Sequence, residues 1–240
     1  MATLDAPVFP VGLVVADKPC LVVGGGRVAW RKIRSLLECR AAVTVVAPEI
    51  CEPLALLAAE PDGGGAAHHH LDVRLRPYRR HEASRYMLVV TATGNPRIDH
   101  MVSEDARGAG VWVNCADDAS HCSVLLPAVH RDGAVSIAVS TAGRSPALAT
   151  WLRTQIADLL GDGLGDMADL VAQARQQVHS TGTSTESMDW TSLFDGPLRD
   201  LIRSGHRDEA MDVIAEALGL APGLHSTSDH SASPEPSPLR

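Results

Sequence analysis

The chain has 240 residues, of which 45% are hydrophobic and only 3% are aromatic, and its formal net charge is −8. This length is enough to bury a full core, in one large domain or two small ones. The negative charge and the scarcity of aromatic side chains argue against nucleic acid as a partner. No apolar run reaches the roughly 18 residues of a membrane span, and the N-terminal stretch does not look like a secretion signal. We therefore expect a cytoplasmic protein with no membrane partner.

Five cysteines stand at positions 20, 39, 51, 115 and 122. Their number is odd and none of them forms a CxxC pair, which argues against both a disulfide framework and a zinc ribbon. We expect small buried side chains here, and no metal site.

The first half of the chain alternates between short apolar runs and segments of helical composition. The expected strands are 20–25, 42–47, 71–76, 86–93 and 111–114, and the expected helices are 27–39, 54–60 and 96–107. Strands that alternate with helices imply a parallel sheet covered on both faces. The predicted fold class is therefore α/β, with a first domain over residues 1–113.

The pattern changes near residue 114. Residues 122–129 and 134–141 are β-like runs separated by the turn signal HRDG, which predicts a hairpin or a sheet extension. Ser145 and Pro146 are typical of a helix start, and this helix is expected to reach Leu160. Further helical segments are expected at 167–179, 193–204 and 207–218. We thus predict a small α+β segment over 114–150, a helical C-terminal domain over 151–220 and a disordered, polar tail over 221–240.

A glycine motif lies between the first strand and the first helix. Gly24, Gly26 and Ala29 fit the pattern G-x-G-x-x-G/A, in which two glycines and one small residue allow a tight turn, the approach of a pyrophosphate and close helix packing. The phosphates would lie over the helix N-terminus. This motif predicts a Rossmann-like, dinucleotide-binding domain; the alternative is that the glycines merely make a tight turn.

Eight residues around this motif are the expected contacts of the cofactor. They are Gly24, Gly25, Gly26, Arg27, Val28, Pro48, Glu49 and Thr93. Glu49 is the first carboxylate after the second strand, where it either reaches the ribose or is simply exposed. No basic residue directly follows that strand, which favours NAD over NADP without deciding between them.

Four ordered stretches together resemble one known family. They are VVGGGRVAWRKIRSLL, TVVAPE, TATGNPRID and VNCADDASHCSVLLPAVHRDGAVSIAVSTAGRSPALATWLR. From about Phe9 to Arg153 the chain resembles the precorrin-2 dehydrogenase family, the dehydrogenase and ferrochelatase portion of siroheme synthases. The resemblance implies NAD-dependent oxidation of a tetrapyrrole, precorrin-2, to sirohydrochlorin. In many members insertion of Fe²⁺, a substrate of that second step, follows. It also implies a homodimer formed through the central segment.

The resemblance ties catalysis to Asp117, in the stretch NCADD. A carboxylate suits the chemistry, because oxidation must release a proton to a base and metal insertion must remove protons from pyrrole nitrogens. The alternative is that Asp117 and Asp118 cap nearby N–H groups in a loop. Asp118 is the weaker catalytic candidate.

The expected substrate contacts are Asn114, Ser140, Thr141 and Ser145. Relatives carry a hydroxyl-rich, glycine-containing turn here, and this chain has Ala142 where the familiar S-T-G-G has glycine. The alternative is that the hydroxyls only form the turn and the cap of the next helix.

Several basic residues are weaker candidates. Arg144 and Arg153 are placed to pair with substrate carboxylates, although a solvated surface position is the simpler interpretation. His121 and His130 flank the same segment and would suit metal delivery, but we expect structural or surface histidines. The trio His68–His70 follows a glycine-rich stretch, and we assign it no native metal site.

The competing functional class is a non-catalytic, NAD-sensing Rossmann module. A sensor needs the glycine turn, but it has no need of an acid after the fifth strand. Because NCADD and STAGRSP both occur here, the sequence favours the enzyme.

Overall fold

The computed structural model describes residues 7–59, 70–180 and 190–219. The predicted disordered tail, as well as His68 and His69, lies outside these residues. The chain forms two compact units. Unit 1 comprises Met1–Ala128 and Val139–Thr150, and unit 2 comprises Val129–Ala138 and Trp151–Arg240.

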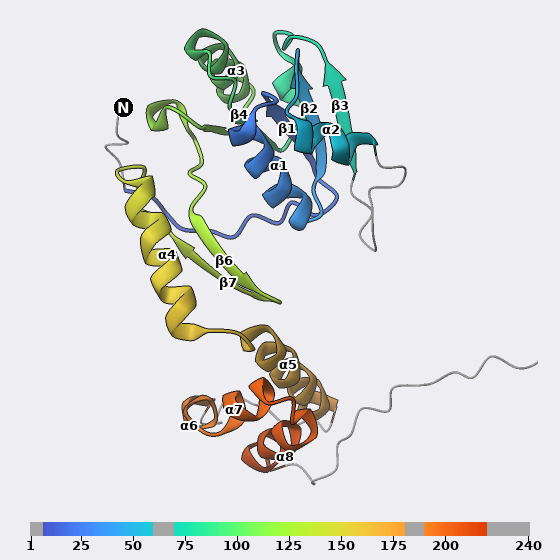
Figure 1. The fold of residues 1–240 in the computed structure, drawn as a ribbon, viewed down its shortest axis with the longest axis vertical. Helices are drawn as coiled ribbons and strands as arrows, with labels where there is room; N and C mark the ends of the chain where they lie inside the picture. The colour runs from blue at the N-terminus through green and yellow to red at the C-terminus, as the bar shows by residue number, and fades with distance from the viewer. Residues whose placement is uncertain (1–6, 60–69, 181–189, 220–240) are drawn as a thin grey trace, which may run out of the picture. The chain divides into compact units, whose positions relative to one another are not determined.

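Unit 1 contains a five-stranded parallel sheet (Figure 1). Its strands are β1 (Pro19–Val23), β2 (Ala42–Ala47), β3 (Leu71–Leu75), β4 (Leu88–Thr91) and β5 (Trp112–Cys115). They lie in the order β3-β2-β1-β4-β5, and every neighbouring pair is parallel. The order reverses between β1 and β4, and such switch points are where open α/β sheets bind ligands. The predicted Rossmann-like α/β class is confirmed.

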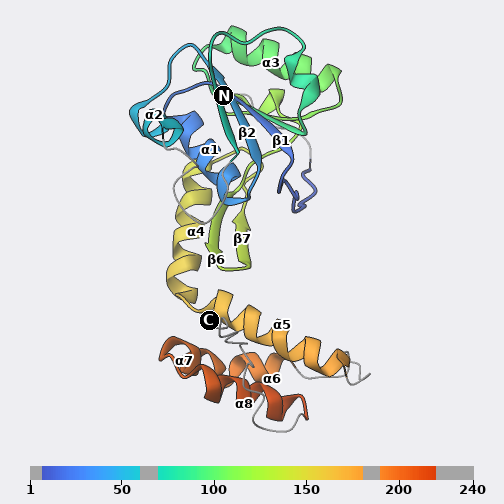
Figure 2. The same cartoon turned by 90° about the vertical axis from the view of Figure 1, so that its right-hand side faces the viewer.

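Three helices cover the two faces of this sheet (Figures 1 and 2). Helices α1 (Arg27–Glu38) and α2 (Glu52–Ala59) pack on one face, and α3 (Pro96–Gly108) packs on the other. Strand β1 shows why both faces need cover: Val22 contributes to the core under α1, while its neighbour Leu21 contributes to the core under α3. Side chains alternate across a strand, so a strand buried on both sides is apolar throughout.

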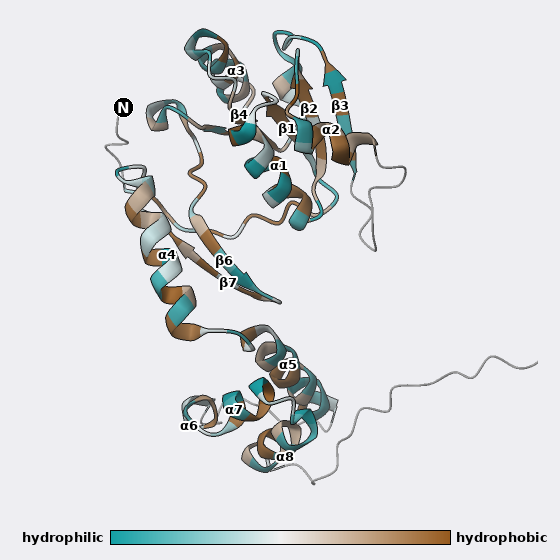
Figure 3. Ribbon diagram, viewed as in Figure 1, coloured by the Kyte–Doolittle hydropathy of each residue, from teal (hydrophilic) through white to brown (hydrophobic). Residues whose placement is uncertain are grey.

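Hydropathy follows this layering (Figure 3). The central strands β1 and β2 are hydrophobic, whereas the edge strand β3 is largely hydrophilic. Strand β3 carries the exposed ion pair Arg74–Asp72, with 2.7 Å between Nη2 and Oδ2. Charged side chains on an edge strand disfavour pairing with another chain.

The segment after β5 differs from the prediction. Residues 122–127 form no strand, so the expected β-run at 122–129 is wrong for most of its length. It bonds to β5 outside a regular ladder: the Ser123 and Val124 N–H groups donate to the Val113 carbonyl at 2.8 and 3.1 Å, and the Val113 N–H donates to Ser123 Oγ at 2.8 Å. Asn114 Nδ2 donates to the Val124 carbonyl at 3.0 Å. Pro127, which lacks an N–H, stands just before the next strand.

The hairpin itself lies further along the chain. Strands β6 (Ala128–Asp132) and β7 (Val135–Val139) form a two-stranded sheet. The turn consists of Gly133, whose φ is +53°, and Ala134. The HRDG signal therefore marks a hairpin, but its first three residues belong to β6.

Five helices follow among the residues that the structure describes. They are α4 (Pro146–Leu160), α5 (Leu164–Ser180), α6 (Trp190–Asp195), α7 (Leu198–Arg203) and α8 (Arg207–Ala217). The last four share a core of their own that includes Leu170, Leu198 and Ile214. The single helix expected over 193–204 is two helices, because Gly196 and Pro197 interrupt it.

Candidate functional site

The glycine turn, residues Gly24–Gly26, lies at the carboxyl end of β1. Gly24 has a φ of +124°, and a Cβ at this position would overlap the Ala92 carbonyl oxygen. Its N–H donates to the Val46 carbonyl at 3.0 Å. Only glycine allows both this left-handed backbone and the close approach to Ala92, the residue that follows β4.

Gly25 and Gly26 differ in what surrounds them. A Cβ on Gly25 would overlap the Glu49 carbonyl oxygen, and the Cys51 N–H donates to the Gly25 carbonyl at 2.8 Å. At Gly26 a Cβ would meet no atom within 4 Å, and this residue caps α1 with no side-chain hydrogen bond. No side chain of the N-cap residue therefore occupies the N-terminus of α1, and this open N-terminus suits a pyrophosphate.

A cavity of about 720 Å³ lies over the glycine turn and the ends of β1 and β2. It is lined by Val23, Gly24, Gly25, Gly26, Val46, Ala47, Pro48, Glu49, Ile50, Cys51, Pro77, Tyr78, Thr93, Asn95, Ile98 and Met101. Six of the eight residues expected to contact the cofactor are among them. This described lining holds a carboxylate, Glu49, and no Lys, Arg or His. It thus fits a ribose diol better than a ribose phosphate.

Thr93 is held by a buried carboxylate that the sequence analysis missed. Asp99, which is 4% exposed, accepts hydrogen bonds from Thr91 Oγ1, from Thr93 Oγ1 at 2.8 Å and from Thr93 N–H at 3.2 Å. Asn95 caps α3 by accepting from the Arg97 N–H at 3.1 Å. Asp99 stands one helical turn beyond this cap. That spacing could have indicated from the sequence that Asp99 faces the loop before α3. These bonds fix the loop between β4 and α3.

A second buried carboxylate supports the far wall of the cavity. Asp105, whose side chain is 2% exposed, accepts hydrogen bonds from the His81 N–H at 2.8 Å, from Arg80 Nη1 at 2.9 Å and from Tyr78 Oη at 3.2 Å. Burial disfavours the charge, but the hydrogen bonds from His81 and Arg80 outweigh it and lower the pKa of Asp105. Burial also raises the pKa of Tyr78. Tyr78 is therefore a neutral wall of the cavity.

Asp117 stands beside the glycine turn. A cavity of about 240 Å³ is lined by Gly26, Arg27, Val28, Ala92, Thr93, Gly94 and Asp117. Arg27 and Val28, the two remaining expected cofactor contacts, are among these residues. The Asp117 side chain is exposed and also lines a neighbouring cavity of about 520 Å³. Asp117 thus borders the space next to the helix N-terminus.

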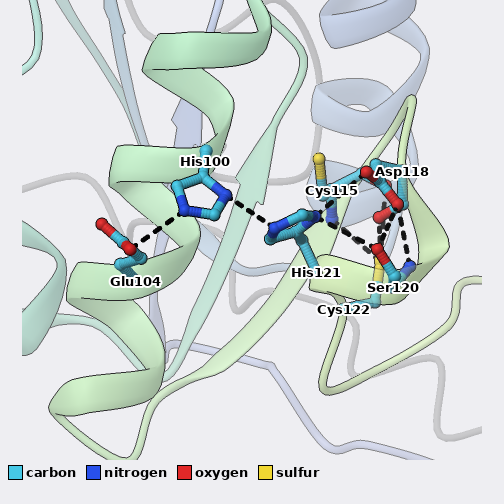
Figure 4. Close-up of polar contacts among 7 residues, drawn as sticks. All are labelled: His100, Glu104, Cys115, Asp118, Ser120, His121 and Cys122. Atoms are coloured by element: carbon cyan, nitrogen blue, oxygen red, sulfur yellow. Dashed lines mark hydrogen bonds and ion pairs between the residues drawn. The ribbon is translucent and has the colours of Figure 1, made fainter. Parts of the chain in front are cut away.

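Asp118 has a different surrounding from Asp117. In the loop of residues 116–121, here called the Asp117 loop, Asp118 Oδ1 accepts from Ser120 Oγ at 2.6 Å and from Ser120 N–H at 3.0 Å. His121 Nδ1 lies 3.0 Å from Asp118 Oδ2 (Figure 4). The Ser120 hydroxyl, followed by the Ser120 N–H and His121, lowers the pKa of Asp118. Its role as a loop cap is therefore realised.

His121 continues into a hydrogen-bonded chain that the sequence analysis did not foresee. His121 Nε2 lies 2.6 Å from His100 Nδ1, and His100 Nε2 lies 2.9 Å from Glu104 Oε1 (Figure 4). His100 and Glu104 are one turn apart on α3, a spacing that signals a pair. Nothing in the sequence places His121 beside them.

A third cavity, of about 400 Å³, brings the expected substrate residues together. Asn114, Ser140 and Thr141 line it from the end of β5 and the turn before α4. The first helix adds Arg31 and Lys32, which were not predicted. Burial, followed by the neighbouring charge of Arg31, lowers the pKa of Lys32. Val28, Arg31, Lys32 and Ser35 are spaced so that they share one face of α1. This spacing could have indicated from the sequence that Arg31 and Lys32 line one cavity.

The hydroxyls before α4 are engaged in local bonds. Thr141 Oγ1 accepts from the Ser145 N–H at 3.0 Å and donates to the Ser145 carbonyl at 3.0 Å. Ser145 Oγ accepts from the Leu148 N–H at 3.2 Å and so caps α4, and Ser145 does not line the cavity. Ser140 Oγ accepts from the Ala142 N–H at 3.2 Å. The predicted turn and cap exist, and the substrate roles remain predictions.

Among the weaker candidates, His121 lines the cavity of about 520 Å³, and the others named below line none of these cavities. Arg144 is exposed, Arg153 is half-buried and His70 is exposed. His130 is half-buried and its Nε2 has no hydrogen-bond partner. Within the part of the chain that the structure describes, no three His, Cys, Asp or Glu side chains are arranged to hold a metal ion.

Two family descriptions match this chain. Residues 11–128 match the putative NAD(P)-binding family, and residues 132–159 match the family of the central part of sirohaem biosynthesis proteins. The siroheme synthase of Thioalkalivibrio sulfidiphilus is 35% identical over 212 residues, which is 88% of this chain and 42% of the relative. That of Nitrosomonas europaea is 33% identical over 213 residues, 88% of this chain and 43% of the relative. The chain is thus similar to siroheme synthases over 88% of its own length.

The similarity extends over different shares of these relatives and of a solved structure. The chain spans less than half the length of these curated relatives. Among solved structures, SirC, precorrin-2 dehydrogenase, aligns with a TM-score of 0.62 at 22% identity over 87% of this chain and 100% of its own. That alignment shows the fold. None of the helices described is long and apolar enough to span a membrane.

Proposed function

We propose that this chain catalyses the NAD-dependent oxidation of precorrin-2 to sirohydrochlorin in siroheme biosynthesis. Siroheme synthases are its relatives and SirC shares its fold. The observation that carries the proposal is the cavity that Asp117 shares with Gly26 at the start of α1. A sensor of NAD has no use for a carboxylate at this point.

The oxidation removes a hydride and a proton from the substrate. Bound NAD supplies the hydride acceptor. The chain must supply a base within reach of the reacting carbon, and Asp117 fills this role in the proposal. The proton that leaves the substrate bonds to the carboxylate oxygen, and water then takes it away.

The tetrapyrrole carries carboxylates that need cationic partners. Arg31 and Lys32 line the same cavity as Asn114, Ser140 and Thr141. Guanidinium and ammonium groups form charge-assisted hydrogen bonds with carboxylates. We assign this cavity to the substrate and the larger cavity over the glycine turn to NAD, with Glu49 at the ribose.

Insertion of Fe²⁺ is the second proposed activity. The metal ion is a substrate here, and the chain would have to accept protons from two pyrrole nitrogens. Asp117 and Asp118 line one cavity of about 520 Å³ together with His121. The two carboxylates are the proton acceptors in this proposal.

We further propose, on the family resemblance, a cytoplasmic homodimer that forms through residues 114–150. Light scattering of the purified chain tests for the dimer.

The oxidation is tested by mixing the purified, nucleotide-free chain with precorrin-2 and NAD under anaerobic conditions. We expect stoichiometric NADH and the spectrum of sirohydrochlorin. A chain that binds NAD but leaves precorrin-2 unchanged would be the sensor instead. Replacement of NAD by NADP is expected to lower kcat/KM, because a 2′-phosphate would face Glu49.

The chelatase arm uses sirohydrochlorin with Fe²⁺ or Co²⁺ and no NAD. Faster metal insertion than in a protein-free mixture would support the second activity. An equal rate would remove it and leave the oxidation untouched.

A further inference from the structure

Helix α3 and the Asp117 loop are joined by a hydrogen-bonded chain of four side chains, Asp118, His121, His100 and Glu104. The distances are 3.0 Å from Asp118 Oδ2 to His121 Nδ1, 2.6 Å between the two rings and 2.9 Å from His100 Nε2 to Glu104 Oε1 (Figure 4). The ring centroids are 4.4 Å apart and the ring planes meet at 72°. Two of the four residues belong to the loop that carries the proposed base.

The bonds of this chain require a fixed number of protons. Each ionised carboxylate accepts a proton from the ring nitrogen that faces it. The contact between the rings needs one further proton, since one nitrogen must donate and the other must accept. All three bonds form together only when the two rings hold three protons, and hence one positive charge, between them. A fourth proton would set two N–H groups against each other, and loss of the third would oppose two lone pairs.

Other charged groups surround the pair from each neighbouring element. Arg97 and Asp99 on α3, with Asp117 and Cys115 at the end of β5, line the same cavity as the two rings. Arg80, which precedes the turn before β4, has its Nη2 3.9 Å from Glu104 Oε2. The two arginines disfavour a further proton on the rings and the carboxylates favour it.

Other bonds anchor the Asp117 loop at its ends and at Asp118, whose carbonyl lies 3.5 Å from Cys122 Sγ. The Ala116 N–H donates to the Thr91 carbonyl on β4 at 2.9 Å. The Cys115 N–H donates to Cys122 Sγ at 3.1 Å. The contact between His121 and His100 instead ties the loop to α3, the helix that also carries Asp99.

We propose that His100 and His121 are positioning residues, which hold the Asp117 loop in its reactive place while the ring pair shares one extra proton. The inference rests on the proposed function for its effect on turnover, but the tether itself does not. Acidification adds the fourth proton, breaks the bond between the rings and releases the loop from α3. Histidine is the side chain that ordinarily gains a proton when a neutral solution is made mildly acidic.

The tether is tested first without substrate, by NMR of the full chain. We expect the ring signals of His100 and His121 to titrate together in two steps, and the amide signals of residues 116–120 to move with the more acidic step. In His100→Gln the ring of His121 should titrate in one step, and the loop amides should no longer respond. His206→Gln, which removes an exposed histidine of unit 2, is the matched control and should change neither.

Turnover gives the second readout. The wild-type rate should fall from an upper pH, where the pair holds three protons, as acidification passes through the more acidic of the two titration steps. His100→Gln should be at least about tenfold slower at the upper pH, because a misplaced base loses its geometry, and should lack this acid limb. Glu104→Gln removes a carboxylate that stabilises the charged pair, so its acid limb should move to lower pH. A merely structural role would not shift the profile.

Two results would overturn the tether: a His121 titration unchanged by His100→Gln, or a wild-type acid limb that persists in that variant. Failure of the proposed function looks different. In that case no NADH forms from precorrin-2 at any pH, while the coupled titration and the response of the loop amides remain.

Discussion

At the scale of single residues, the three glycines of the turn have separate reasons to be glycine. A Cβ on Gly25 would overlap the Glu49 carbonyl, whereas a Cβ on Gly26 would meet no protein atom within 4 Å. Gly26 has a φ of −79°, which any residue adopts. The fold therefore does not require glycine here, and in the proposed function the missing side chain leaves room for the pyrophosphate.

This difference predicts two distinct variants. Gly26→Ala should keep the Tm of the wild type but bind NAD about tenfold more weakly, because its methyl group fills the space of the pyrophosphate. Gly25→Ala should instead lower the Tm, because backbone must move. Thermal unfolding and calorimetric titration with NAD measure the two effects. Unchanged NAD affinity in Gly26→Ala would contradict the assigned phosphate position.

Asp105 makes a prediction about stability and pH. The lowered pKa of this carboxylate means that the folded chain favours its ionised form. Its contribution is fully present above the unfolded value, about 4, and is lost as the pH falls through the lower folded value. Asp105→Asn should cost about 1.5–3 kcal/mol at neutral pH, since it weakens hydrogen bonds to a charged group. Chemical unfolding should show this cost shrinking at acid pH; a cost independent of pH would refute it.

At the scale of elements, the turn before α4 combines a strained residue with a good cap. Ala142 has a φ of +52°, and Ser145 caps the helix. Ala142→Gly should raise the free energy of unfolding by up to about 1 kcal/mol, because relief of left-handed strain outweighs the entropy of glycine. Ser145→Ala should lower it by about 1 kcal/mol. Denaturant titrations measure the free energy of unfolding of both variants. A change of the same sign in both would show that strain at Ala142 and the Ser145 cap do not account for the stability of this turn.

The regular elements of unit 1 were predictable because each has a clean local signal. The run LVV in β1 is buried on both faces, and Pro96 after Asn95 marks the start of α3. The segment 122–127 misled because it is apolar without being in a ladder. The Ser123 and Val124 N–H groups share the one Val113 carbonyl, and the remaining bonds come from the side chains of Ser123 and Asn114. Periodicity carries no information about such contacts.

At the scale of the whole molecule, the candidate site could be predicted only in part. The glycine turn and Asp117 stand in motifs, so the sequence identifies them. Tyr78 and His100 acquire their surroundings from segments more than twenty residues away in the chain, as the bond from Tyr78 to Asp105 and the 2.6 Å contact between His100 and His121 illustrate. Such pairings depend on the packing of α3 against the end of β5, which no local pattern specifies.

The two units have separate hydrophobic cores. Ligand that binds the glycine turn should therefore protect the first unit selectively. NAD at about 100 times its Kd should stabilise that unit by about 2.7 kcal/mol and slow amide exchange in β1, β2 and β4, with no change in α5 to α8. Hydrogen exchange with mass spectrometry checks this. Equal protection of α5 to α8 would mean that the helices respond to the cofactor.

The most direct test of the central claim is hydride transfer in Asp117→Ala under anaerobic conditions with precorrin-2 and NAD. The account predicts that NADH formation falls at least about 100-fold, the lower range for loss of a general base, while the Kd for NAD is unchanged. Asp118→Ala, the matched variant at the neighbouring position, should lose less. Turnover of Asp117→Ala at the wild-type rate would contradict the claim that this carboxylate takes the proton.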